Sequence, residues 1–243
     1  AVSAVGLIDT INNMFIQIFT AIATGTTVVI AQLSGRRDDD GIHKTVGQSS
    51  ALMTLIMTLI GLMVILFGAP IFDLLYPKVE TAVRSDALVY FKVTGASYPF
   101  FALMIILTGI FRGSGNTRTP MLISLWVNII NIALNAVFIY GFHMGVAGAA
   151  LATLIARIVG TLMMVAATLH KYGRYVFRWE NLRFTGRILK PVLNISLPSG
   201  LDTALFQGGR LIVSIFVARM ATAAISANTI AGSMFGLICI PGH

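Results

Sequence analysis

The sequence predicts an all-α membrane protein, folded as a polytopic helical bundle. Three observations carry this prediction: the scarcity of charge, the length of the apolar blocks, and the placement of basic residues in alternate loops. Of the 243 residues, 56% are hydrophobic and 11% are charged, whereas a soluble domain carries about 25% charged residues. A larger soluble core does not explain the deficit, because any soluble domain must still cover its surface with polar groups.

Apolar blocks divide the chain into segments that are each long enough, or nearly so, to cross a membrane as a helix. A spanning helix needs about 20 apolar residues. No block shows the period-two alternation of barrel strands. The blocks are residues 7–33, 46–69, 87–111, 120–141, 146–169, 191–218 and 222–241. They predict six helices and most of a seventh.

Prolines and turn residues predict local details within this plan. Pro99 and Pro198 lie inside apolar blocks and should bend their helices, because proline removes a backbone hydrogen bond and clashes with the preceding turn. Thr119 is expected to cap the helix that follows it, with Pro120 in the first turn.

The basic residues indicate how the chain is oriented. Loops 34–45, 112–119 and 170–190 hold eleven of them: Arg36, Arg37, Lys44, Arg112, Arg118, Lys171, Arg174, Arg178, Arg183, Arg187 and Lys190. The opposite set holds only Lys78, Arg84, Lys92 and Arg219. Because cytoplasmic loops are enriched in Lys and Arg, the first set is predicted to face the cytoplasm. This dispersed charge does not indicate a nucleic-acid partner.

A short repeat predicts the domain organisation. The first residues, AVSAV (1–5), recur as AISAN (224–228). Six predicted helices lie between the copies, so the repeat is parallel. It predicts a protein about twice this length, with the chain starting at the second helix of one bundle. Residues 1–170 then form an N-terminal lobe of helices two to six. Residues 171–190 form a cytoplasmic linker, and residues 191–243 begin a C-terminal lobe.

Several motifs, in order along nearly the whole chain, resemble the multidrug and toxic compound extrusion (MATE) family. They are FRGSGNTRTPM (111–121), a helix with Asn131 and Asn135, GVAGAALAT (145–153), LPSGLDTALFQGGRLIVS (197–214) and AAISAN (223–228). The resemblance implies a twelve-helix fold of two six-helix lobes, here lacking its first helix. It implies a multi-pass cell-membrane antiporter that exports drugs or other organic, often cationic, compounds in exchange for Na⁺ or H⁺. It implies no cofactor and no obligate protein partner besides the bilayer.

Asn128, Asn131 and Asn135 are the first candidate site residues. Their spacing places them on one helical face, and amides in hydrocarbon must find partners inside the bundle. Interhelical hydrogen bonding and a cation site both fit this pattern. The resemblance favours a cation site with Na⁺ at Asn131, Asn135 and Thr153. Asn135 stands where many members carry Asp, and a neutral amide cannot exchange a proton in the useful range.

Further ionisable and polar residues inside the blocks are candidates too. Asp202 must be paired, solvated or protonated if it lies in hydrocarbon. The resemblance places an acidic coupling residue nearer Gln207. Arg157 is interpreted as a structural pair or a snorkelling side chain, with Arg157, Arg210 and Gln17 as candidate cavity or gate residues. Asp9 is expected to be solvated near the outer mouth.

The sequence offers little support for an enzyme. His43, His143, His170 and His243 lie far apart, and Cys239 is the single cysteine, so the chain contains no recognisable catalytic constellation. An intramembrane enzyme and a lipid or lipid-linked oligosaccharide flippase are the alternatives to a transporter. Flippases of that kind usually have a strongly basic cavity, whereas only Arg157 and Arg210 lie within the predicted spans.

Overall fold

The computed structural model describes residues 2–75, 81–173 and 184–218, and every regular element within these ranges is a helix. The elements are α1 (Val2–Gly35), α2 (Asp39–Leu75), α3 (Thr81–Ala96), α4 (Tyr98–Gly113), α5 (Arg118–Ala136), the short π-helix η1 (Val137–Gly141), α6 (Gly145–Tyr172) and α8 (Gly186–Ala218). The all-α bundle predicted from the sequence is therefore confirmed. The predicted helix at 222–241, the repeat copy at 224–228 and most of the linker lie outside the described residues, so the domain boundaries stay a prediction.

Within the described ranges, four helical segments are long and apolar enough to cross a bilayer: Ile11–Gly35, Asp39–Leu74, Arg118–Gly141 and Gly145–Tyr172. The third predicted block forms two helices, Arg84–Ala96 and Tyr98–Gly113, which meet at 48° and supply a fifth span if counted together. The predicted block 191–218 also forms a helix, α8, but this helix is not among the apolar spans. Its apolar residues are interrupted by Pro191, Pro198, Asn194, Asp202 and Gln207.

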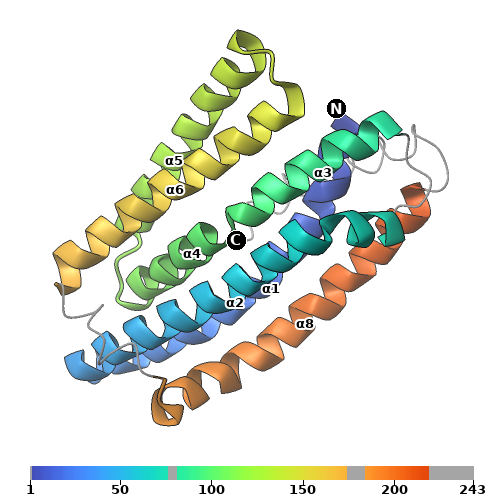
Figure 1. Cartoon of the computed structure of the whole chain (residues 1–243). Coiled ribbons are helices and arrows are strands. Elements are labelled where there is room, and N and C mark those ends of the chain that lie inside the picture. The colour runs from blue at the N-terminus through green and yellow to red at the C-terminus, as the bar shows by residue number, and fades with distance from the viewer. Residues whose placement is uncertain (1, 76–80, 174–183, 219–243) are drawn as a thin grey trace.

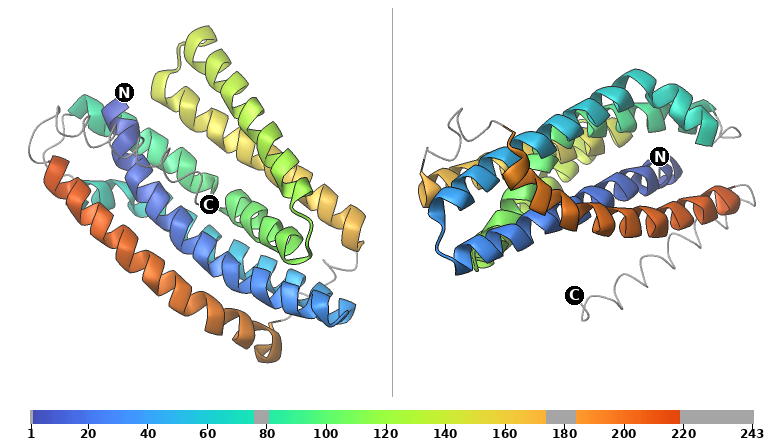
Figure 2. Two further views of the ribbon diagram at one scale, coloured as in Figure 1. Left: turned by 180° about the vertical axis from the view of Figure 1, so that it is seen from behind. Right: turned by 90° about the horizontal axis from the view of Figure 1, so that it is seen from below.

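The helices lie side by side and run alternately up and down (Figure 1). Helix α1 is central, because it packs against α2, α3, α4 and α8. Helix α6 packs against α3, α4 and α5, so α5 lies at the edge of the bundle (Figure 2). Leu125, Trp126, Ile129 and Ile132 of α5 are exposed, which suits a face that lies against lipid.

Small residues let α1 and α8 approach closely. A Cβ atom added to Gly25 would lie 2.1 Å from the Oγ of Ser196 and 2.6 Å from the carbonyl oxygen of Val192. Small side chains allow this kind of backbone approach between membrane helices, where van der Waals packing is the main attraction. The contact fixes α8 along the central helix of the bundle.

The loops at residues 34–45 and 112–119 gather at one end of the bundle, together with the start of α8 (Figures 1 and 2). We call this the basic end, after Arg36, Arg37, Lys44, Arg112 and Arg118 of these two loops. That the two loops share one end with the start of α8 agrees with the orientation predicted from their charge.

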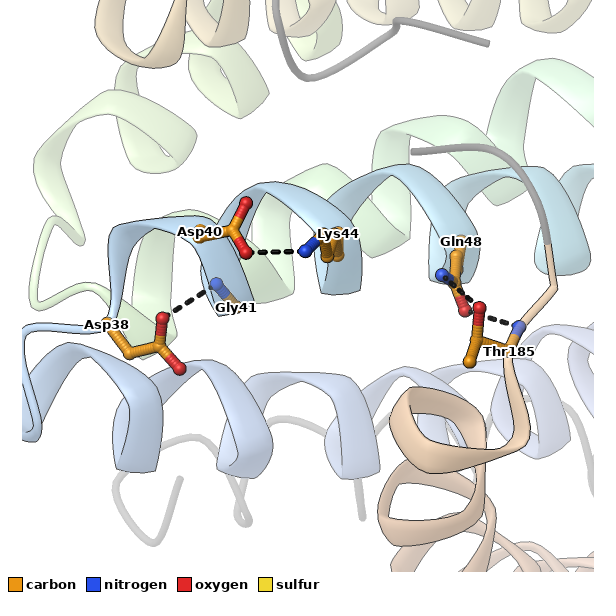
Figure 3. A network of polar contacts seen from close by, with 6 residues as sticks. All are labelled: Asp38, Asp40, Gly41, Lys44, Gln48 and Thr185. Atoms are coloured by element: carbon orange, nitrogen blue, oxygen red, sulfur yellow. Dashed lines mark hydrogen bonds and ion pairs between the residues drawn. The ribbon is translucent and has the colours of Figure 1, made fainter. Parts of the chain in front are cut away.

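Polar contacts organise the start of α2 and of α8 at the basic end (Figure 3). The Asp38 carboxylate accepts a hydrogen bond from the Gly41 amide at 2.9 Å, which caps α2. One turn further on, Lys44 pairs with Asp40. The side chain of the buried Gln48 accepts a hydrogen bond from the Thr185 amide at 3.0 Å and donates one to the Thr185 hydroxyl at 3.4 Å. Gln48 thereby attaches the entry to α8 to the side of α2.

Candidate functional site

Asn131 and Asn135 of α5 form a direct amide pair. The Nδ2 of Asn135 donates a hydrogen bond to the Oδ1 of Asn131 at 3.0 Å. The Oδ1 of Asn135 is buried and accepts no hydrogen bond from any residue that the structure describes. A buried polar oxygen without a partner is costly, and in a native protein it calls for a ligand such as water or an ion. The structure thus brings together two of the residues predicted for a cation site.

Thr153 of α6 lies at about the same height in the bundle as Asn135. Two close approaches between α5 and α6 define the register: a Cβ on Gly160 would lie 2.6 Å from Val127, and one on Gly148 would lie 3.0 Å from the Cβ of Phe138. Counting residues along α5 and α6 between these two approaches places Asn135 opposite the turn that contains Thr153. The Thr153 hydroxyl donates to the Ala149 carbonyl at 3.0 Å, which leaves its oxygen able to accept or coordinate.

The remaining predicted site residues lie elsewhere. Asn128, Gln17 and Asp202 are exposed, and Gln207 is half-buried. The structure brings none of these four into the Asn131–Asn135 pair. The side chain of Arg210 lies outside those that the structure describes.

A second polar cluster links α1, α3 and α4. The Tyr90 hydroxyl donates to the Asp9 carboxylate at 3.1 Å. One turn along α1, the buried Asn12 accepts a hydrogen bond from the Tyr98 hydroxyl at 2.6 Å and donates one to the Thr94 hydroxyl at 3.4 Å. Asp9 is half-buried and hydrogen bonded, rather than solvated near the mouth as expected from its position in the sequence.

Arg157 of α6 completes this cluster at the break between α3 and α4. Its Nη1 donates to the Ser97 hydroxyl at 2.6 Å, and its guanidinium lies 4.4 Å from the centroid of the Phe101 ring. It also interacts electrostatically with Asp9. The Thr161 hydroxyl, one turn along α6, donates to the Phe100 carbonyl at 2.7 Å. Side chains of α6 therefore satisfy polar groups at the point where the helix is interrupted, as buried polar groups in a membrane require.

No role was predicted from the sequence for Asn12, Tyr90, Ser97 or Tyr98. One signal was available for Asn12. Asn12 lies three residues after Asp9, on the same helical face, and a polar pair inside an apolar block points into the bundle. Nothing in the sequence indicated that Ser97 would meet Arg157.

Oxygen donors dominate both clusters. Among the described residues, no three His, Cys, Asp or Glu side chains lie close enough to hold a metal ion. Amide and hydroxyl oxygens suit a hard cation such as Na⁺ better than they suit a transition metal. A bundle of spanning helices with one broken span, and with amides and charges held inside it, defines a membrane transporter as the class of protein.

Comparison with known proteins agrees with this class. The MatE family matches residues 1–137, and the chain belongs to the MATE family of transporters. It is 29% identical over 230 residues to the uncharacterized transporter YisQ of Bacillus subtilis, which covers 93% of the chain and 50% of YisQ. It is 28% identical to the probable multidrug resistance protein NorM of Thermotoga maritima, over 87% of the chain and 46% of NorM.

Solved structures show the same fold. A multidrug resistance MATE transporter in its outward-facing conformation superimposes with a TM-score of 0.85 at 26% identity, over 98% of this chain and 53% of that one. An inward-facing MATE structure superimposes with a TM-score of 0.89 at 24% identity, over 98% and 54%. The chain spans about half the length of the relatives that it matches. It therefore corresponds to about half of a twelve-helix MATE fold.

Proposed function

We propose that the chain is part of a secondary active antiporter that exports drugs or other organic compounds in exchange for Na⁺ or H⁺. Membership of the MATE family supports this proposal, as do relatives that include NorM and the multidrug export protein MepA of Staphylococcus saprophyticus. We further propose that the protein lies in the cell membrane, with its basic end toward the cytoplasm.

The unpaired buried oxygen of Asn135 is the observation that carries the proposal. It lies beside the Asn131 amide, and we propose that Thr153 of the adjacent helix α6 supplies a third oxygen to the same small cation. Such a site binds a cation by coordination, and the amides themselves carry no proton. Coupling to H⁺ would require a carboxylate, and Asp9 supplies one in the neighbouring cluster.

Binding alone does not transport, so the ion must favour one conformation of the protein over another. The break at Ser97 lies where Arg157 of α6 joins the polar cluster of α1, α3 and α4, and the two helices that meet there are bent by 48°. We propose that this broken span lets the outer and inner halves of the bundle move separately. Cation binding would then bias the side of the membrane to which the exporter opens.

The test uses the full-length protein in proteoliposomes, with a fluorescent substrate and an imposed Na⁺ or H⁺ gradient. The proposal predicts substrate movement against its own gradient with one of the two ions, abolished when that gradient is collapsed. Asn135→Leu should reduce this movement at least tenfold, whereas the exposed Asn128→Leu should not. Substrate movement that persists without any ion gradient would contradict antiport.

A further inference from the structure

A cavity of about 890 Å³ lies between α1, α4 and α5, close to the basic end. It does not include Asn131, Asn135 or Thr153 among its lining residues, so it is separate from the proposed cation site. Its volume is in the range of pockets that bind drug-sized molecules. The residues that line it should therefore influence which compounds the proposed exporter binds.

The charges that line this cavity are of one sign. Arg112 at the end of α4 and Arg118 at the start of α5 both line it, and no Asp or Glu does. Neither arginine forms an ion pair with a described residue. Both guanidinium groups are exposed and permanently charged, so each can receive a carboxylate, sulfonate or phosphate group with paired hydrogen bonds.

A third positive charge lies directly behind the cavity wall. Phe101 lines the cavity, and the guanidinium of Arg157 lies 4.4 Å from the centroid of its ring. The ring face that Arg157 occupies is not available for a cation–π contact with a bound cation. Because Arg157 is half-buried against Phe101 and Ser97, its field is less screened there than it would be in solvent.

The rest of the wall suits a molecule with an apolar body. Phe101, Met104, Met121 and Met164 line one part of it, and flexible thioethers adapt to apolar ligands of varied shape. Thr20, Thr24, Thr27, Thr108, Thr117 and Ser124 add hydroxyl groups. The hydroxyls of Thr20, Thr24 and Thr27 already donate to backbone carbonyls. Those of Thr108, Thr117 and Ser124 can donate hydrogen bonds to an anionic group without adding charge.

We propose that this cavity binds amphipathic organic anions, that is, compounds with an apolar ring system and one carboxylate, sulfonate or phosphate group. This inference rests on the proposed function, and it differs from the often cationic compounds that the resemblance to the MATE family implies. A cation entering the cavity would meet two lining guanidinium groups, with a third behind Phe101, and no lining carboxylate. An anion would meet the guanidinium groups of Arg112 and Arg118 at the basic end, while its ring system packs against Phe101 and the methionines.

The experiment compares two dyes that share one ring system, anionic fluorescein and cationic rhodamine 123. Their binding to the full-length protein is measured by fluorescence anisotropy in nanodiscs of neutral phosphatidylcholine. We expect fluorescein to bind at least tenfold more tightly than rhodamine 123. Arg112→Gln and Arg118→Gln should each weaken fluorescein binding about tenfold, the effect of losing one charge-assisted hydrogen-bonding partner. Neither change should weaken rhodamine binding.

Two controls place the binding in the cavity. Arg36→Gln removes an exposed charge at the same basic end but outside this cavity, and it should leave fluorescein binding unchanged. Ser124→Trp should fill the cavity and weaken fluorescein binding. Equal loss in Arg36→Gln, no loss in Ser124→Trp, or rhodamine binding as tight as fluorescein would each overturn the proposal.

Two further outcomes distinguish this inference from binding of a lipid headgroup and from the proposed antiport. Displacement of fluorescein by anionic phosphatidylglycerol in the nanodisc would identify a lipid headgroup as the occupant, which would also overturn it. Because the assay measures binding without any ion gradient, its result is independent of whether antiport occurs. Gradient-driven export with no charge preference would refute this inference and leave the proposed function intact.

Discussion

The guanidinium of Arg157 donates a hydrogen bond of 2.6 Å to the hydroxyl of Ser97, the residue at which the third membrane span bends by 48°. Ser97 is buried, and its hydroxyl in turn donates to the Thr94 carbonyl at 2.6 Å. Helix α6 thus contacts the broken span at its bend and holds it in place. This contact joins the bend to the cluster that contains Asp9.

Removing the Ser97 hydroxyl should destabilise the protein, because the Arg157 guanidinium loses its acceptor in a buried position. Ser97→Ala is expected to lower the free energy of unfolding by about 1–3 kcal/mol. Thermal unfolding of the detergent-solubilised full-length protein measures this effect. Ser124→Ala, at an exposed position of α5, is the matched control and should change little. Equal melting temperatures for the two variants would show that the contact contributes nothing to stability.

The Tyr98 hydroxyl should contribute far more to the free energy of unfolding than the hydroxyl of a tyrosine on the surface. Tyr98 is 0% exposed and donates to the Asn12 amide oxygen at 2.6 Å, so Tyr98→Phe leaves a buried acceptor unpaired, at a cost of about 1–3 kcal/mol. Tyr140 is 78% exposed, and Tyr140→Phe should be neutral. Chemical or thermal unfolding distinguishes the pair. A neutral Tyr98→Phe would mean that Asn12 finds another donor.

The sequence alone predicted more of the fold than of the site. Long apolar blocks identify spanning helices because lipid leaves the backbone no other partner. The bend near Pro99 was also foreseeable: the break falls at Ser97, and Pro99 occupies the first turn of α4, where its missing N–H is not needed. The capping prediction at Thr119 was wrong. Helix α5 already begins at Arg118, and the Thr119 amide donates to the Asn116 side chain at 3.2 Å. The sequence offers several capping residue types in this loop and does not decide among them.

Contacts between helices were beyond prediction for a physical reason. Asp9 and Tyr90 are separated by 81 residues, and whether they meet depends on how α1 and α3 rotate about their axes. Apolar blocks that are hydrophobic all round carry no signal for that rotation. The Asn131–Asn135 pair could be predicted because both residues lie on one helix, four residues apart.

Packing between α1 and α8 should depend on Gly25 having no side chain. Gly25→Ala would bring a Cβ within 2.6 Å of the Val192 carbonyl oxygen, so the two helices must separate. We expect a loss of about 1–3 kcal/mol in unfolding free energy. Gly35→Ala is the matched control, because a Cβ there meets nothing within 4 Å. Unfolding curves that coincide for the two variants would contradict the close packing.

Gln48 should protect the Thr185 amide from solvent, since its Oε1 accepts that hydrogen bond at 3.0 Å (Figure 3). Gln48→Leu is expected to increase amide hydrogen exchange at Thr185 at least tenfold, because opening there would no longer break this bond. Mass spectrometry of peptides covering the start of α8 measures the change. Gln32→Leu, at an exposed position of α1, should leave the exchange rate as it is.

The account rests on the buried, unpaired oxygen of Asn135 serving as a cation ligand. Isothermal titration of the full-length protein with NaCl, against choline chloride as the ionic-strength control, tests this most directly. We predict saturable Na⁺ binding that Asn135→Leu weakens at least tenfold and Asn128→Leu leaves unchanged. Na⁺ binding of equal affinity in wild type and Asn135→Leu would contradict the account.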